Sequence, residues 1–163
     1  MKARKIVHSA IIAAMYVALT YVSASLGLAS GSIQVRLSEA LTILPFFTPY
    51  AIWGLAIGCF VSNVLTGCLP PDIIFGTIAT IIGAVSTYSV SKLKLFKYKK
   101  WLVPVGPILS NAIIIPFVLK YAYGLKDGIW FMFLTVGAGE VISCGIIGML
   151  LFFSLEKRAN KLF

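Results

Sequence analysis

The sequence feature that most constrains this chain is an uninterrupted apolar run close to its first residue. Residues 6–28 contain no lysine, arginine, aspartate or glutamate. A helix needs about 20 apolar residues to cross the hydrocarbon core of a bilayer. The basic residues ahead of the run resemble the start of a signal peptide, but the run is longer than the roughly 7–15 apolar residues of such a peptide. We therefore interpret it as a membrane-spanning helix.

The rest of the chain has the same character. Hydrophobic residues make up 60% of the 163 residues and charged residues only 12%, whereas about 25% of an ordinary soluble domain is charged. A soluble globule is excluded. The expected fold is an all-α membrane protein, with residues 1–163 forming a single integral membrane domain. Six helices are predicted, at about residues 8–28, 37–47, 51–69, 72–91, 101–121 and 128–155.

The net charge of +9 is carried mainly by the two chain ends and by residues 92–100. This distribution favours a lipid bilayer over nucleic acid as a partner, because the basic residues do not gather on one face. Lysine and arginine are retained on the cytoplasmic side during insertion. With six crossings, only Arg36, Lys120 and Lys126 fall on the opposite side. The sequence thus predicts a multi-pass protein with cytoplasmic N- and C-termini.

Glu140 stands out among the polar residues because it lies far inside an apolar segment. At 1.5 Å per residue it is expected about 17 Å deep, near the midplane. A carboxylate there costs at least about 2.5–3.5 kcal/mol unless it meets a partner, a cavity or a ligand. Asn111 is expected at nearly the same height, and Glu39 and Asn63 join it if their helices face the same cavity. These four residues are the core of a predicted binding site; buried structural hydrogen bonding is the alternative.

So few acceptors suit a compact organic ligand better than an ion pathway, which needs a relay of carboxylates. One carboxylate can accept two parallel hydrogen bonds from a guanine-like edge, a second can neutralise an amine, and asparagine can donate and accept. Tyr123 and Trp130 are candidates for stacking on a flat heterocycle, with membrane-interface anchoring as the alternative. Asp72 begins a predicted helix and is expected to cap it, or else to contribute to the site.

Two further patterns concern metals and partners. The three cysteines lack metal-ligand spacing and His8 is the only histidine, so no metal site is predicted; the cysteines are interpreted as small apolar packing residues. In the first helix Ala10, Ala14 and Ala18 recur every four residues. Small residues at this spacing let another helix approach closely, either within the bundle or from a partner protein.

The size, the six expected crossings with both ends inside and this alanine stripe resemble the substrate-binding (S) component of an energy-coupling factor (ECF) vitamin transporter. More narrowly, the chain resembles the QueT family, assigned to precursors of the modified tRNA base queuosine. The motifs that carry this resemblance are Gln-Val-Arg-Leu-Ser-Glu-Ala-Leu at residues 34–41, Leu-Pro at 44–45, Ala-Ile-Trp-Gly-Leu at 51–55, and residues 72–77 and 106–111. The resemblance covers nearly the whole chain.

The resemblance implies a non-enzymatic binding subunit in a bacterial plasma membrane, with no cofactor of its own. The chain has no Gly-x-x-x-x-Gly-Lys-Ser/Thr loop, so ATP would be used by partner subunits. The implied partners are two ATPases and a membrane scaffold, which would dock on the alanine stripe. The implied ligand is a 7-deazaguanine such as 7-aminomethyl-7-deazaguanine, queuine or queuosine. Gln34 and Arg36 are carried over as loop residues near the site.

Three alternatives remain open from the sequence. The first is an S component for another vitamin, of the riboflavin or thiamine type. The second is a stand-alone secondary transporter, which would need no ATPase partner. The third is a structural membrane protein whose buried polar residues only tie its helices together.

Overall fold

The computed structural model describes residues 2–28, 34–93 and 99–158 of the chain. These residues are helical apart from their connections. In chain order the elements are α1 (Lys2–Ser25), the 3-10 helix η1 (Leu37–Phe46), α2 (Ala51–Leu65), α3 (Pro70–Lys92), the 3-10 helix η2 (Lys99–Leu102), α4 (Val105–Tyr121), α5 (Ile129–Glu140), the π-helix η3 (Val141–Gly148) and α6 (Met149–Glu156).

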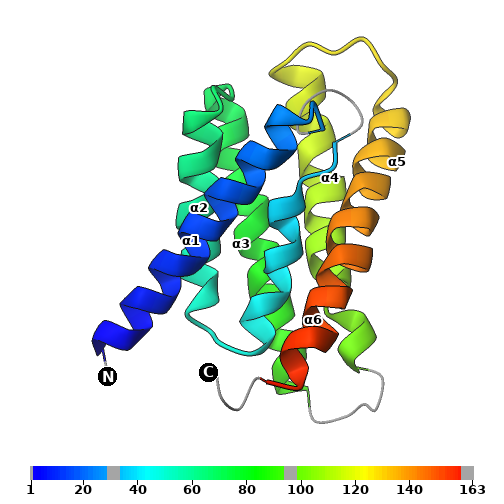
Figure 1. Cartoon of the computed structure of the whole chain (residues 1–163). Coiled ribbons are helices and arrows are strands. Elements are labelled where there is room, and N and C mark those ends of the chain that lie inside the picture. The colour runs from blue at the N-terminus through cyan, green and yellow to red at the C-terminus, as the bar shows by residue number, and fades with distance from the viewer. Residues whose placement is uncertain (1, 29–33, 94–98, 159–163) are drawn as a thin grey trace.

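The helices run alternately up and down in a bundle (Figure 1). The start of α1 and the end of α6 lie at one end of it, and the α2–α3 and α4–α5 connections lie at the other. We call the latter the loop end, formed by residues 26–28, 34–36, 66–69 and 122–128. This topology brings residues that are distant in sequence to the same height.

The membrane character predicted from hydropathy is confirmed. Four helical stretches are long and apolar enough to cross a bilayer, namely Lys5–Ser25, Pro70–Lys92, Lys99–Tyr121 and Ile129–Glu156. The other two apolar helices, Leu37–Phe46 and Ala51–Leu65, are shorter. The predicted helix at 51–69 ends early because Gly67 adopts a left-handed φ of +73°, the conformation that commonly terminates a helix.

The predicted helix at 37–47 is present, but as a 3-10 helix. A 3-10 helix rises about 2.0 Å per residue, so the ten residues of η1 cover about 20 Å. Residues Ser38 to Pro45 are all buried, and η1 packs against α1, α3 and η3. It is therefore an internal element that its neighbours shield from lipid.

The last predicted helix, at 128–155, extends over Ile129–Glu156 but changes type on the way. The π-helix η3 begins directly after Glu140 and buries Ser143 and Cys144. The wider turn of a π-helix is rare and is often found at functional sites. Here it lies beside the deepest carboxylate predicted from the sequence.

Large apolar side chains cover the outside of the bundle, as Trp53, Leu134 and Leu150 illustrate with 69%, 73% and 65% exposure. This pattern is expected where lipid is the solvent, because lipid is as apolar as the side chains. Many polar side chains are buried instead, Glu39, Asn63 and Asp72 among them.

Close approach of α1 and α2 depends on glycine. A Cβ on Gly54 would lie 2.6 Å from the carbonyl oxygen of Ser9, and one on Gly58 would lie 2.7 Å from the Cβ of Tyr16. The intramolecular contact of α1 therefore uses the face that carries Ser9 and Tyr16. The alanine stripe lies on another face, and its members Ala10, Ala14 and Ala18 are all exposed.

Candidate functional site

The centre of the candidate site is Glu39, which is only 2% exposed. Its Oε1 accepts hydrogen bonds from the Tyr16 hydroxyl of α1 and, at 3.4 Å, from Thr80 Oγ1 of α3. Its Oε2 accepts one from Asn111 Nδ2 of α4 at 3.4 Å. Side chains from three helices thus converge on one carboxylate of η1.

Glu140 lies next to this group. The Cys144 thiol donates to Glu140 Oε2 at 3.3 Å, and it also lies 3.3 Å from the backbone oxygen of Glu39. One ligand atom each from Glu39, Glu140 and Cys144 falls within 4.8 Å of the others. We call the six residues Tyr16, Glu39, Thr80, Asn111, Glu140 and Cys144 the inner cluster.

The two carboxylates of the inner cluster have no cationic partner among the described residues. The ion pairs found there are Arg36 with Asp72 and Lys100 with Glu156. Two close carboxylates without an ion-pair partner are costly inside a membrane. The inner cluster is consequently suited to receive a cationic group. Two carboxylates and a thiol can also act as metal ligands. The spacing of cysteine and histidine in the sequence does not predict this combination.

A second polar group lies at the loop end. Arg36 Nη1 donates to Asn63 Oδ1 at 3.4 Å, and Arg36 Nη2 lies 3.9 Å from Asp72 Oδ2. The Tyr123 hydroxyl donates to Asp72 Oδ2 at 2.9 Å and accepts from the Leu69 amide at 3.2 Å. We call Arg36, Asn63, Asp72 and Tyr123 the mouth group.

Burial and the neighbouring Asp72 carboxylate raise the pKa of Tyr123 above its usual range. Its hydroxyl therefore stays protonated at neutral pH and remains a donor to Asp72. By contrast, Arg36 Nε and Asp72 Oδ1 are buried and have no hydrogen-bond partner among the described residues. One donor and one acceptor of the mouth group are thus not used within the described residues.

A pocket of about 360 Å³ lies at the mouth group, within the roughly 300–1,000 Å³ of small-molecule sites. Its lining consists of Thr20, Ala24, Gln34, Arg36, Thr66, Gly67, Cys68, Asp72, Leu119, Tyr123 and Leu125. Thr20 is one helical turn, about 6 Å, from Tyr16, and Leu119 is about 12 Å along α4 from Asn111. The inner cluster therefore begins one to two turns below the pocket.

Hydrogen bonds join the two polar groups through Cys59. Its sulfur accepts from Asn63 Nδ2 at 3.6 Å and from Thr80 Oγ1 at 3.4 Å. Asn63 belongs to the mouth group and Thr80 to the inner cluster, so a polar column runs from the pocket to the two carboxylates. Cys59 and Cys144 are buried in the core, as expected of apolar packing residues, and their sulfur atoms also take part in these hydrogen bonds.

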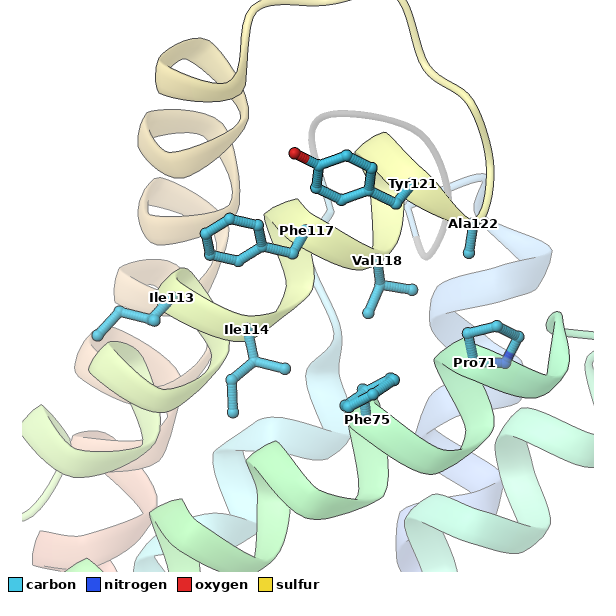
Figure 2. Close-up of a pocket in the computed structure, with 8 residues that line it drawn as sticks. All are labelled: Pro71, Phe75, Ile113, Ile114, Phe117, Val118, Tyr121 and Ala122. Atoms are coloured by element: carbon cyan, nitrogen blue, oxygen red, sulfur yellow. The ribbon is translucent and has the colours of Figure 1, made fainter.

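A larger hollow of about 580 Å³ lies elsewhere, on the outer surface between α3 and α4. Figure 2 shows its lining, in which the Tyr121 hydroxyl is the one polar side-chain group (Pro71, Phe75, Ile113, Ile114, Phe117, Val118, Tyr121 and Ala122). Phe75, Ile113 and Phe117 are about half exposed. The surface offers almost nothing to hydrogen-bond a heterocycle, and in a bilayer it faces lipid chains.

The structure brings Glu140, Asn111 and Glu39 together, whereas Asn63 lies with Arg36 at the loop end. The prediction that Asp72 caps its helix is wrong, because α3 begins at Pro70 with Leu69 as its N-cap. The Asp72 side chain instead contacts Arg36 and Tyr123. Gln34 and Tyr123 line the pocket.

Trp130 has a different environment from the other candidates. It is 78% exposed, and its ring packs on Phe133 with 5.7 Å between centroids. It is not part of the pocket lining. This is the position expected of an aromatic residue that anchors a helix at the membrane interface.

Sequence reasoning missed Tyr16, Thr80 and Cys144 of the inner cluster. Each is a polar or polarisable residue inside an apolar helix. The depth of each residue in the membrane could have been predicted from its position along that helix. Hydropathy gives that depth but not the rotation of the helix about its axis. Sequence reasoning also missed Gly139. A Cβ at this position would overlap the backbone oxygen of Gln34, so only glycine allows the close approach. The pocket-lining segment thus rests directly against α5 beside Glu140.

Residues 6–157 match the family described as QueT transporter. The chain belongs to the QueT family. One QueT protein, named queuosine precursor transporter QueT, from Lactococcus lactis subsp. cremoris (strain MG1363), is 38% identical over 81 residues. That match covers 50% of this chain and 47% of the relative, so the chain matches about half the length of this curated QueT protein. No solved structure matches the chain.

Proposed function

We propose that this QueT-family chain is the substrate-binding S component of an ECF-type transporter for a queuosine precursor. The ligand is a 7-deazaguanine, which joins a guanine edge to a cationic aminomethyl arm. Membership of a transporter family supports transport, and the name of the lactococcal relative supports the ligand class.

The observation that carries this proposal is the pair of close, buried carboxylates of Glu39 and Glu140. Asn111 of α4 lies beside them and donates a hydrogen bond to Glu39. An ammonium group on the ligand supplies the ion-pair partner that neither Glu39 nor Glu140 has among the described residues. Charge-assisted hydrogen bonds of this kind contribute about 1.5–3 kcal/mol each. Tyr16 and Thr80 hold Glu39 in place from the opposite side.

The proposal includes six crossings with both termini in the cytoplasm, an S-component-like bundle and a location in the bacterial plasma membrane. The charge asymmetry of the sequence supports this orientation. The alternating course of the helices supports only that the start of α1 and the end of α6 lie on the same side (Figure 1). The pocket then opens at the loop end, toward the outside of the cell.

Delivery of the ligand is proposed to depend on partners. The exposed stripe of Ala10, Ala14 and Ala18 is the docking surface for the membrane scaffold, because small residues permit close helix contact. Two ATPase subunits on the scaffold use ATP, and this chain contributes no cofactor. Neither its ligand nor its partners include nucleic acid.

The deciding experiment is calorimetric titration of the detergent-purified chain with 7-aminomethyl-7-deazaguanine, queuine, queuosine and guanine. Nanomolar binding of a deazaguanine, with guanine rejected, supports the proposal. Binding of riboflavin or thiamine in its place would indicate an S component for another vitamin. A chain that binds none of these molecules, although folded by circular dichroism, is not a queuosine-precursor binder.

A further inference from the structure

The mouth group contains a donor and an acceptor that nothing else in the described residues uses. Arg36 Nε and Asp72 Oδ1 are both buried without a hydrogen-bond partner. Both residues line the pocket of about 360 Å³. Leaving such groups unpaired is costly, so each points to a ligand atom that completes it.

The two unused atoms differ in kind from those of the inner cluster. Arg36 and Asp72 carry opposite charges 3.9 Å apart, so together they are close to neutral. The inner cluster holds two carboxylates without a paired cation among the described residues. The molecule therefore presents a neutral donor–acceptor pair at the pocket wall and a negative site one to two helical turns below it.

We infer that Arg36 and Asp72 recognise the guanine edge of the ligand while the inner cluster binds its ammonium group. This inference rests on the proposed function and adds an orientation to it. A guanine edge presents one acceptor, O6, beside two donors, N1–H and the 2-amino group. Arg36 Nε donates to O6, and Asp72 Oδ1 accepts from the N1 and 2-amino side. The aminomethyl arm then points down the polar column toward Glu39 and Glu140.

Charge decides between this orientation and its reverse. An ammonium at the mouth group would meet the Arg36 guanidinium together with Asp72, and its attraction to one would be offset by repulsion from the other. The same ammonium at the inner cluster meets two carboxylates that no basic residue pairs with among those described. Because electrostatic interactions are stronger where water is excluded, the inner position is strongly favoured.

The orientation has a consequence for ligand size. The inner cluster is closed by the Tyr16, Thr80 and Cys144 side chains, all of them buried. A primary ammonium is small and can donate hydrogen bonds to these groups, whereas a ring attached to the amine would need much more room among buried side chains. The chain therefore selects the unsubstituted 7-aminomethyl-7-deazaguanine over queuine, whose amine carries a cyclopentene ring.

The test compares two trimmed ligands on two variants. The ligand 7-methyl-7-deazaguanine lacks the amine, and 7-aminomethyl-7-deazahypoxanthine lacks the 2-amino group. On the wild-type chain each deletion should weaken binding tenfold or more. Asp72→Asn should abolish the penalty for deleting the 2-amino group and leave the penalty for deleting the amine, and Glu140→Gln should do the opposite. Asp127→Asn, a carboxylate change in the loop before α5, is the matched control and should leave both penalties unchanged.

The possible outcomes separate the inference from the proposed function. In the reverse orientation, Asp72→Asn abolishes the loss of affinity caused by deleting the amine, and Glu140→Gln abolishes the loss caused by deleting the 2-amino group. That result overturns the inference while the proposed function stands. If the wild-type chain binds no deazaguanine, both are overturned. Should Asp72→Asn fail to fold, Arg36→Gln tests the same edge. The comparison of 7-aminomethyl-7-deazaguanine with queuine needs no variant, and equal affinity for the two overturns the orientation.

Discussion

Asn111 Nδ2 donates to Glu39 Oε2 across 3.4 Å, although 72 positions separate the two residues in the chain. The bond connects α4 to the 3-10 helix η1 in the interior of the bundle. An amide at this position can stay with the carboxylate or turn its own oxygen toward a ligand. The geometry of Glu39 is thereby coupled to that of α4, and ligand affinity should respond to changes on either element.

Glu140→Gln should weaken binding of 7-aminomethyl-7-deazaguanine tenfold or more. The substitution keeps the shape of the side chain but removes one charge, and a charge-assisted hydrogen bond contributes about 1.5–3 kcal/mol. Calorimetry on the folded variant measures the effect. Unchanged affinity with intact helicity would falsify the assignment of Glu140 to the ligand.

Tyr16→Phe should also reduce affinity, by about tenfold, because it removes the hydroxyl that donates to Glu39. Tyr21→Phe is the matched control on the same helix, since its hydroxyl donates to the Leu65 backbone oxygen at the surface. The two variants should be titrated in parallel. Equal affinities would show that Tyr16 does not hold the binding carboxylate.

Ala14→Trp should leave ligand binding intact and abolish uptake. Ala14 is exposed on the alanine stripe, and an indole there would prevent close helix docking. Met15→Trp is the control, because Met15 is 46% exposed on a neighbouring face of α1. Uptake of labelled ligand is measured in cells that also produce the scaffold and ATPases. Normal uptake by the Ala14 variant would argue against this docking surface.

Gly58→Ala should lower the melting temperature of the purified chain. The added Cβ would lie 2.7 Å from the Tyr16 Cβ, and overpacking of this kind costs about 1–3 kcal/mol. Gly128→Ala adds the same methyl group where nothing lies within 4 Å. Thermal unfolding in detergent compares the two, and a Gly58 variant as stable as the Gly128 variant would contradict the tight α1–α2 contact.

Much of the fold was predictable because hydropathy reports the length and position of apolar segments. Each predicted helix has its counterpart, with shifts of a few residues at the ends. The type of helix was not predictable. Nothing in residues 37–46 distinguishes a short α-helix from the buried 3-10 helix η1, since the difference depends on what surrounds it. The π-helix after Glu140 was not predictable either, because hydropathy does not distinguish a π-helix from an α-helix within a largely apolar segment.

The depth of the site residues in the membrane was predictable, but the side of each helix on which they lie was not. The depths of Glu140 and Asn111 correctly indicated that they lie near one another, with Glu39 added on the condition that η1 faces them. Asn63 contacts Arg36 rather than Glu39 or Glu140, and Tyr16 and Thr80 were not predicted. In a soluble helix the polar face reveals the rotation, but in lipid both the outside and the inside of a helix can be apolar. Rotation therefore had to come from the structure.

The 3-10 helix η1 also bears on how the chain enters the membrane. Its ten residues cover about 20 Å, less than the roughly 30 Å hydrocarbon core, and its interior is buried on all sides. Such a segment cannot be inserted into lipid as an independent span. It must be accommodated by flanking helices that are already in place, so the ligand-binding carboxylate of Glu39 reaches its final depth only when the bundle assembles around it.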